Sequence, residues 1–195
     1  MKISVIGNGE CVKTKRVGSD IDSCDRVVRI NKFVVDGYEE FVGSRLDIYC
    51  SKWHKIMFRE PEFISRHNEF WFPHPEPPTQ WGSPGGTGTI TTSQHEQNKN
   101  ILNINDDKIK FLPTPAIELL DTKFKLAEPS VGIVALVMAR YLYPEAEIYV
   151  TGFDGLSSGW YWDSTHDCLE SCRNSVMLER VFYREYIEQD NVYEF

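Results

Sequence analysis

The chain has 195 residues, of which 41 % are hydrophobic and 26 % are charged, and its formal net charge is −8 at pH 7. This size and composition predict a single domain over residues 1–195 with an apolar core. Binding to the phosphate backbone of nucleic acids depends on basic side chains, so we expect no nucleic-acid partner for this acidic chain.

The apolar runs and the cysteines of the sequence indicate in which cellular compartment we expect the protein. The longest apolar run, residues 131–139, is shorter than the ~18 residues that a membrane span requires, and no signal-peptide core follows Met1. The five cysteines are an odd number at irregular spacing. This pattern favours reduced thiols over a disulfide framework, and we expect a cytoplasmic protein without a transmembrane segment.

The first half of the chain contains four apolar segments that predict β-strands: Lys2–Ile6, Arg26–Ile30, Leu46–Cys50 and Glu69–Phe72. Residues 11–16, after the first strand, predict a turn or a short helix. Residues 73–97 are rich in proline, glycine, serine and threonine and predict a long loop. Long loops in compact domains often cover a binding site, so this segment is a candidate flexible lid.

In the second half, strands and helices alternate. Segments 109–112 and 147–151 predict strands, and segment 116–120 predicts the start of a helix. A longer helix is predicted from Pro129 to Tyr143, and an amphipathic helix is predicted over residues 173–187. Strands that alternate with helices predict a Rossmann-like α/β/α sandwich with a mostly parallel sheet.

Polar residues and glycines follow several of the predicted strands. Asn8, Asn31, Ser51 and Gly152 each come at or just after a strand end, and Ser130 is placed to begin a helix. Ligands of open α/β sheets bind beyond the carboxyl ends of the strands, and helix N-termini favour anions. The alternative is that these are ordinary turn residues, but several of them at one sheet edge favour a binding site.

The first strand runs directly into Gly7-Asn8-Gly9. Glycines at a strand end allow another group to approach the backbone closely. The segment lacks the third glycine of the dinucleotide fingerprint, so a standard NAD site is not expected. The sequence therefore predicts that a ligand group approaches the end of the first strand, and the Asn8 side chain suits neutral polar ligands and phosphate oxygens alike.

Four groups of residues, in order along the chain, together resemble the sialyltransferase family. Segments 5–9, 21–23, 25–31, 37–39 and 42–45 resemble its long donor-binding motif, and segments 129–132 and 148–153 resemble its short motif. Tyr161-Trp162-Asp163 resembles the third motif. His166, with Glu170 or Glu179 beyond it, resembles the final very short motif. The middle third of the chain is not matched.

The resemblance implies a single Rossmann-like domain, a GT-A-like variant, that binds a CMP-activated sugar and transfers it to a glycan with inversion and without a metal. It implies His166 as the catalytic base, with Glu170 or Glu179 placed to orient it. The donor-binding residues that it implies, together with those expected at the strand ends, are Gly7, Asn8, Gly9, Asn31, Ser51, Ser130, Val131, Gly132, Gly152, Phe153, Tyr161 and Trp162.

Several residues depart from the family pattern. Val131 replaces a hydroxyl residue of the short motif, and Trp160 stands where a histidine is expected. Ser51 stands where an asparagine would meet cytosine in the smaller bacterial enzymes. The two cysteines of the family disulfide are missing, which agrees with a reducing compartment. These differences leave another CMP-sugar such as CMP-Kdo, another nucleotide sugar, or a non-catalytic nucleotide-binding module as alternatives.

The chemistry of transfer agrees with this assignment. An imidazole near its pKa is a suitable base for a hydroxyl group, and His166 is the candidate in the expected motif order, although four other histidines occur. A one-phosphate leaving group needs a divalent ion less than a diphosphate does, and no Asp-x-Asp motif occurs. His166, Cys168 and Cys172 provide only three potential zinc ligands, so no metal or other cofactor is expected. The oligomeric state is left open.

Overall fold

The computed structural model describes residues 1–51, 69–73, 96, 99–100, 103–125, 129–165 and 176–195. Seven strands belong to one sheet: β1 (Lys2–Ile6), β2 (Arg26–Ile30), β3 (Ile48–Cys50), β4 (Glu69–Phe72), β5 (Ile109–Phe111), β6 (Glu147–Thr151) and β7 (Val192–Glu194). The α-helices are α1 (Gly18–Ser23), α2 (Glu39–Val42), α4 (Thr114–Phe124), α5 (Val131–Leu142) and α7 (Val176–Ile187), and two 3₁₀ helices are η1 (Glu10–Thr14) and η3 (Asp106–Lys108).

All pairings between the described strands are parallel, in the order β5-β4-β3-β2-β1-β6-β7. The chain moves outward from β1 through β2, β3, β4 and β5, then returns to place β6 on the other side of β1. The strand order therefore reverses between β1 and β6. Ligands of open α/β sheets bind at the carboxyl ends of strands beside such a reversal.

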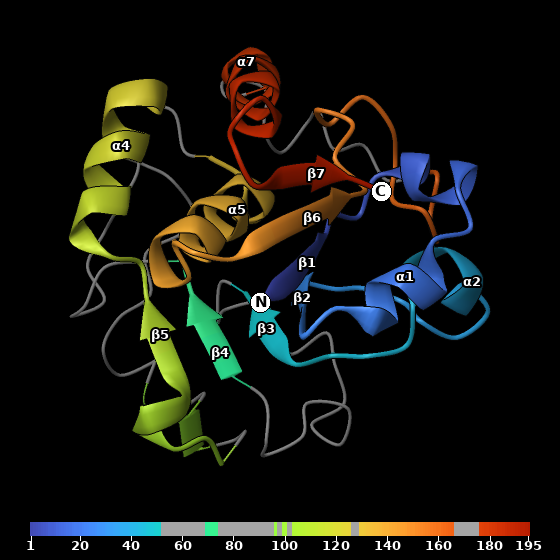
Figure 1. Cartoon of the computed structure of the whole chain (residues 1–195), viewed down its shortest axis with the longest axis horizontal. Helices are drawn as coiled ribbons and strands as arrows, with labels where there is room; N and C mark the ends of the chain where they lie inside the picture. The colour runs from blue at the N-terminus through green and yellow to red at the C-terminus, as the bar shows by residue number, and fades with distance from the viewer. Residues whose placement is uncertain (52–68, 74–95, 97–98, 101–102, 126–128, 166–175) are drawn as a thin grey trace.

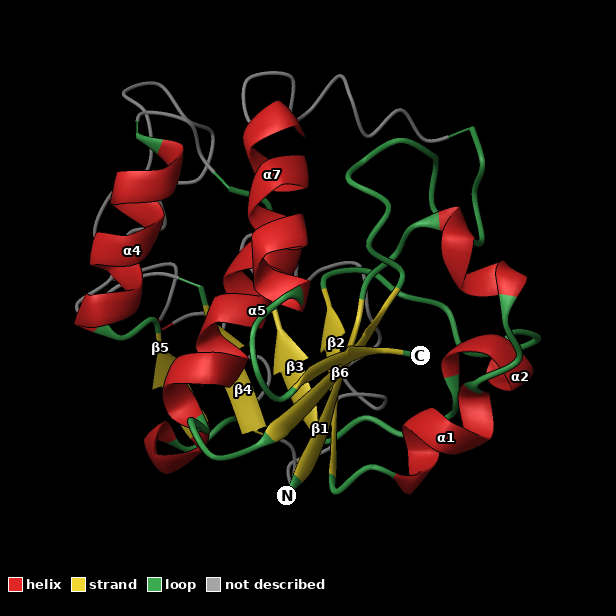
Figure 2. Cartoon of the chain, turned by 45° about the horizontal axis from the view of Figure 1, so that its top comes forward, coloured by secondary structure: helices red, strands yellow, loops and turns green. Residues whose placement is uncertain are grey.

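Helices cover both faces of the sheet (Figure 1). Helices α4, α5 and α7 lie together on one side, and α1 and α2 lie on the other (Figure 2). Helix α5 packs on β1 and β2, and its residues 131–139 are all buried, which explains its almost uninterrupted apolar sequence. The predicted α/β sandwich with a parallel sheet is confirmed.

Several elements depart from the sequence-based expectation, and β3 begins at Ile48, two residues after the expected start at Leu46. Helices α1 and α2 and strand β7 were not predicted, because each has six residues or fewer and too few apolar positions to show a period. Helix α4 begins at Thr114, two residues before the segment 116–120 in which the start of a helix was expected, and it continues to Phe124. The candidate lid at 73–97 lies outside the described residues apart from Pro73 and Glu96. Among the described helices, none is long and apolar enough to cross a membrane.

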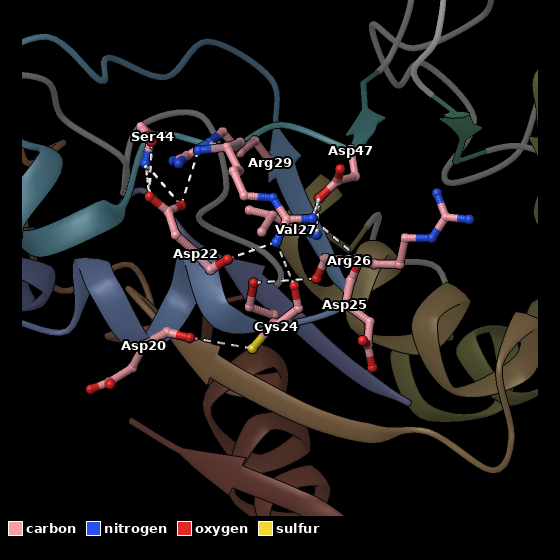
Figure 3. A network of polar contacts seen from close by, with 11 residues as sticks. Asp20, Asp22, Cys24, Asp25, Arg26, Val27, Arg29, Ser44 and Asp47 are labelled. Atoms are coloured by element: carbon pink, nitrogen blue, oxygen red, sulfur yellow. Dashed lines mark hydrogen bonds and ion pairs between the residues drawn. The ribbon is translucent and has the colours of Figure 1, made fainter.

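A polar network joins α1 to the loop between α2 and β3 (Figure 3). The Asp22 carboxylate accepts hydrogen bonds from the N–H and hydroxyl groups of Ser44 and from the N–H of Arg45, at 2.8–3.0 Å. Asp47 accepts from Val27 N–H and from Arg45, both at 2.9 Å. These residues lie at the amino ends of β2 and β3. Much of the segment that resembles the long donor motif therefore holds the fold together and lies away from the carboxyl edge.

The guanidinium of Arg29, which is 1 % exposed, completes this part of the structure. It donates to the carbonyl groups of Arg45, Val42 and Gly43 at 2.7–2.9 Å, and it lies 5.3 Å from the centre of the Phe33 ring. Buried charges are tolerated when hydrogen bonds replace water. Arg29 thus fixes the path of the chain that enters β3.

Candidate functional site

Three predicted site residues follow three neighbouring strands at the carboxyl edge of the sheet. Asn8 follows β1, Asn31 follows β2 and Ser51 follows β3. The Ser51 hydroxyl donates to Oδ1 of Asn31 at 3.3 Å, and Asn31 N–H donates to the Cys50 carbonyl at 2.9 Å. The structure therefore brings these three residues together, as the sequence predicted.

The side chain of Asn8 shapes the turn that holds Asn31. Its Nδ2 donates to the Ile30 carbonyl at 3.2 Å and to the Lys32 carbonyl at 2.9 Å. These carbonyls flank Asn31, whose φ of 47° is in the left-handed region. Because both amide hydrogens of Asn8 point at carbonyls, only its Oδ1 is left, and this atom is buried without a hydrogen-bond partner.

The two asparagines therefore offer different chemistry to a ligand. Asn31 Nδ2 makes no hydrogen bond within the described part of the chain. An anionic ligand needs donors, and Asn31 has N–H groups to give, whereas Asn8 presents an acceptor. In this arrangement Asn31 is the better candidate for contact with a phosphate, and Asn8 supports it.

Gly7 and Gly9 form backbone hydrogen bonds with the end of β6 and the loop that follows it. Gly7 N–H donates to Thr151 at 2.7 Å and Gly9 N–H donates to Gly152 at 3.0 Å. A Cβ on Gly7 would lie 2.2 Å from the Gly152 carbonyl oxygen, and one on Gly9 would lie 2.7 Å from the Asp154 carboxylate. Gly7 thus requires glycine, because a Cβ there would meet backbone, whereas a Cβ on Gly9 would meet the end of a side chain. Their predicted role toward a ligand stays a prediction.

Ser130 is the N-cap of α5, as predicted. Its hydroxyl oxygen accepts from Ile133 N–H at 3.4 Å, and its carbonyl accepts the helical bond from Val134 N–H at 3.1 Å. The N–H groups of Val131 and Gly132 precede that first helical bond. Unpaired N–H groups and the helix dipole favour a negative group at this end of a helix.

The two segments of the short motif meet at the start of α5. A Cβ on Gly132 would lie 3.1 Å from the ring of Phe153, which follows β6. The Phe153 ring also stacks on Tyr183 of α7, with 5.5 Å between ring centres and 18° between planes. Gly132, Gly152 and Phe153 are therefore neighbours, although about 20 residues separate them along the chain.

Tyr161 and Trp162 lie beside the end of β1. Tyr161 N–H donates to the Asn8 carbonyl at 3.0 Å, and its hydroxyl accepts from Val34 N–H at 3.0 Å and donates to the Val34 carbonyl. Its side chain is 2 % exposed, so its contacts in this structure are structural. The Trp162 ring packs on Trp160 with centres 5.1 Å apart, and its Nε1 is buried without a hydrogen-bond partner.

Two of the three predicted catalytic residues, His166 and Glu170, lie outside the described residues. The third, Glu179, is 3 % exposed and accepts from Ser130 N–H at 2.6 Å and from the Ser130 hydroxyl at 2.9 Å. Sequence reasoning placed Glu179 near the base and missed its contact with Ser130. The two residues are 49 positions apart, and nothing in their local sequence pairs them.

Thiol chemistry is not supported at this edge of the sheet. Burial raises the pKa of the Cys50 thiol well above its usual range, and burial together with the Asp154 carboxylate raises the pKa of Cys11 to about 11. Thiols act as nucleophiles and metal ligands in the thiolate form. Cys11, Cys24 and Cys50 are all unbonded cysteines.

The fold and the carboxyl edge define a Rossmann-like α/β protein with a candidate site for a phosphorylated ligand. Residues 2–177 match the profile of glycosyltransferase family 29 (sialyltransferase), so the chain belongs to this family. Relatives include mouse CMP-N-acetylneuraminate-beta-galactosamide-alpha-2,3-sialyltransferase 1, 28 % identical over 171 residues, and human type 2 lactosamine alpha-2,3-sialyltransferase, 27 % identical over 229 residues.

The chain spans 48 % of the length of the mouse relative and 63 % of the human one, while these matches cover 84 % and 98 % of the chain. A mammalian sialyltransferase in complex with Gal-beta-1-3GalNAc-ortho-nitrophenol has the same fold, with a TM-score of 0.68 and 20 % identity, over 100 % of this chain and 68 % of that one. Sialyltransferase CstII from Campylobacter jejuni, in complex with the substrate analogue CMP-3FNeuAc, matches with a TM-score of 0.55 and 12 % identity over 99 % and 80 %.

Proposed function

We propose that this chain is a sialyltransferase that moves sialic acid from a CMP-activated donor to a hydroxyl group of a glycan. Membership of the sialyltransferase family over residues 2–177 is the observation that carries the proposal. The matched range contains all three polar residues at the ends of β1, β2 and β3 and the N-terminus of α5. The mouse relative is named for CMP-N-acetylneuraminate, which supports the choice of donor.

The site has suitable groups for a leaving CMP phosphate. Asn31 Nδ2 and the N–H groups of Val131 and Gly132 are hydrogen-bond donors near the carboxyl edge of the sheet. Donors that are already in place stabilise the charge that develops on a leaving phosphate without reorganisation in the transition state. The dipole of α5 adds a positive potential at the same end of the helix.

The proposed reaction is a single displacement. His166 removes the proton from the acceptor hydroxyl as its oxygen attacks the anomeric carbon, and CMP leaves from the opposite face. One displacement from the opposite face inverts the configuration at that carbon. A single phosphate carries less charge than a diphosphate, so the protein donors suffice and the proposed reaction is independent of a metal.

Binding of CMP is the first test of this proposal. Calorimetric titrations of the wild-type protein with CMP, UMP and GMP are expected to show binding that is selective for CMP. Incubation with CMP-sialic acid and a β-galactoside should then give a sialylated product, with and without EDTA. His166→Ala is expected to keep CMP binding and to lose transfer by at least 100-fold, the lower range for general base catalysis.

CMP-Kdo serves as the competing donor, because Ser51 and Val131 differ from the family pattern. Transfer from CMP-Kdo in preference to CMP-sialic acid would keep the reaction class and change the sugar. CMP binding without transfer of either sugar would favour a nucleotide-binding module. An absence of CMP selectivity would overturn the proposed donor class.

A further inference from the structure

A pocket of about 400 Å³ lies between the loop after β6 and the C-terminal half of helix α7. Four loop residues between positions 153 and 157 line one wall, and α7 lines the other wall from Arg180 to Ile187. The volume is in the range that holds a small organic ligand. Asn8, Asn31 and Ser130 do not line this pocket, so it is separate from the strand ends and from the start of α5.

One part of the pocket lining is apolar. The rings of Phe153 and Tyr183 stack with 5.5 Å between their centres, and Ile187 follows Tyr183 by one turn of α7. The Tyr183 hydroxyl already donates to Glu194 of β7 at 2.7 Å, so this side chain brings its ring and no free hydrogen to the pocket. Such a lining suits the C–H groups of an organic ligand better than a bare inorganic ion.

Arg180 is a fixed cation at the wall of the pocket. Its Nε donates to the Gly155 carbonyl at 2.9 Å, and a Cβ on Gly155 would lie 2.5 Å from its Cγ, so the side chain packs directly on the turn. Within the described part of the chain, its two terminal nitrogens make no hydrogen bond or ion pair. A guanidinium that is already held in place loses little conformational freedom when it binds an anion.

Arg184 is the second cation, one turn further along α7. It is exposed, and it makes no hydrogen bond or ion pair with the described residues. Like charges four residues apart on a helix repel each other. An anion between the two guanidinium groups would replace this repulsion with attraction, and a carboxylate accepts two parallel hydrogen bonds from one guanidinium.

The charges and donors of the pocket favour a monoanion. Asp154 also lines it, but its carboxylate accepts from Ser157 N–H at 3.3 Å and from the Ser158 hydroxyl, so it is engaged within its own loop. With two arginines and this one aspartate, the lining side chains carry a net charge of +1. One carboxylate balances this charge, whereas a phosphate dianion exceeds it. The Ser157 hydroxyl makes no hydrogen bond within the described residues and adds a donor.

We propose that this pocket binds the carboxylate of a sugar acid, of the sialic acid kind, at a site separate from the donor nucleotide. The geometry favours an organic monoanion, and the choice of a sugar acid rests on the proposed function. Arg180 and Arg184 bind the carboxylate, and the apolar wall contacts the C–H groups of the sugar. A free sugar acid and the terminal residue of a sialylated glycan both present this group, and titration with each distinguishes the two sources.

Calorimetric titration of the full chain with N-acetylneuraminic acid tests the charge requirement. The methyl ester of this acid keeps the sugar and removes the negative charge. It is expected to bind at least about tenfold more weakly, the equivalent of one hydrogen bond to a charged group. Saturating CMP should change the affinity for the acid by less than about twofold, because the pocket and the strand ends are separate.

Arg184→Gln removes one cation of the pocket. It should lower the affinity for the acid about tenfold and change the affinity for the ester by less than about twofold. The variant is expected to fold, because the side chain is exposed and has no hydrogen bond to lose within the described residues.

Arg26→Gln is the matched control, because it makes the same change in net charge away from the pocket. Arg26 is exposed and begins β2, at the amino edge of the sheet. Its guanidinium makes no hydrogen bond or ion pair within the part of the chain that the structure describes. This variant should bind the acid as the wild-type protein does.

A second pair of titrations, with 3′-sialyllactose and with lactose, identifies the source of the sugar acid. Binding of 3′-sialyllactose that is at least as tight as binding of the free acid, and that depends on Arg184, would assign the pocket to the end of a sialylated glycan. Binding of the free acid alone would assign the pocket to a free sugar acid. Lactose lacks the carboxylate and should not bind there.

The outcomes separate this inference from the proposed function. The pocket assignment would be overturned if the wild-type protein binds no sugar acid, if it binds acid and ester equally, or if Arg184→Gln binds the acid as tightly as Arg26→Gln. Loss of the acid on addition of CMP would also overturn it, because the sugar would then occupy the donor site. Failure to bind CMP would overturn the proposed function alone, since binding of the acid that depends on Arg184 would still support the pocket.

Discussion

Gly7 and Gly152 interlock at the ends of β1 and β6. A Cβ on Gly7 would lie 2.2 Å from the Gly152 carbonyl oxygen, and a Cβ on Gly152 would lie 2.4 Å from the Gly7 carbonyl oxygen. Both distances are far below a van der Waals contact. The contact lies where the strand order reverses, so it fixes the geometry of the sheet edge that carries the candidate site.

Gly7→Ala is expected to destabilise the protein by about 2 kcal/mol, because the added methyl group must push two backbone segments apart. Gly152→Ala should cost more, about 3 kcal/mol, since Gly152 also has a φ of 78°. Chemical denaturation monitored by circular dichroism measures both free energies of unfolding.

Gly37→Ala is the control that separates strain from contact. Gly37 has a φ of 82°, but a Cβ there would meet no atom within 4 Å. Its substitution should cost only the backbone strain, about 1 kcal/mol. If Gly7→Ala lowers the free energy of unfolding as little as Gly37→Ala does, the backbone segments that follow β1 and β6 separate easily.

Tyr161→Phe is expected to lower the free energy of unfolding by about 1–3 kcal/mol, because the N–H and C=O groups of Val34 each lose a hydrogen bond to the tyrosine hydroxyl. Tyr38→Phe makes the same chemical change in a ring 5.2 Å away whose hydroxyl makes no hydrogen bond within the described residues. Thermal unfolding compares the two. If Tyr161→Phe is as stable as Tyr38→Phe but binds CMP more weakly, Tyr161 contacts the donor as first predicted.

The sequence was sufficient for the strands with strong local patterns. β1, β2, β4 and β6 were placed with their observed bounds, because each is a short run of apolar or β-branched residues bounded by polar ones. β7 has only three residues, and Tyr193 within it is 44 % exposed, so no apolar run marks it. Its pairing with β6 depends on the position of α7, which local sequence does not define.

For the site, the sequence identified the residues at the strand ends and left their contacts undefined. Asn8 and Asn31 have the same side chain, and each directly or closely follows a strand. Only the structure shows that both amide hydrogens of Asn8 are donated to carbonyl groups of the turn around Asn31. Likewise, Glu179 is one of several charged residues on an amphipathic helix. Its pairing with Ser130 arises from the packing of α7 beside α5.

Asp22 should make stability depend on pH. Partial burial opposes ionisation of its carboxyl group, but the N–H groups of Arg45 and Ser44 outweigh burial and lower its pKa below 3.8. A lowered pKa in the folded state stabilises the protein above the unfolded pKa, and this contribution is lost as pH falls through the folded pKa. The stability advantage over Asp22→Asn should therefore be constant from pH 7 to about 5 and shrink below about 4.

Chemical denaturation at several pH values measures this advantage. Asp20→Asn, on the same helix, controls for the change in net charge, because the Asp20 carboxylate accepts no hydrogen bond within the described residues. An advantage over Asp22→Asn that grows as the solution becomes more acidic would contradict the assigned role of the network in Figure 3.

Asn31→Gly separates donor binding from turn geometry. Glycine adopts the left-handed conformation of Asn31, with its φ of 47°, without strain. It removes the Oδ1 that accepts the Ser51 hydroxyl and gives the unfolded chain more freedom, so the free energy of unfolding should fall by about 1–2 kcal/mol. The variant loses the only side-chain N–H groups that we assign to the phosphate, and CMP should bind at least about tenfold more weakly. Asn8→Ala should instead lower both stability and CMP affinity, because it releases the turn.

Asn191→Gly is the matched control for this comparison. Asn191 also has a left-handed φ, 64°, but it precedes β7 and so lies at the amino edge of the sheet. The same substitution there should leave CMP binding unchanged. The assignment of the phosphate contact to Asn31 would be reversed by one result: wild-type CMP affinity in Asn31→Gly, and a large loss of CMP affinity in Asn8→Ala at equal stability. Asn8 would then turn its amide toward the phosphate on binding and give up its hydrogen bonds to the Ile30 and Lys32 carbonyls.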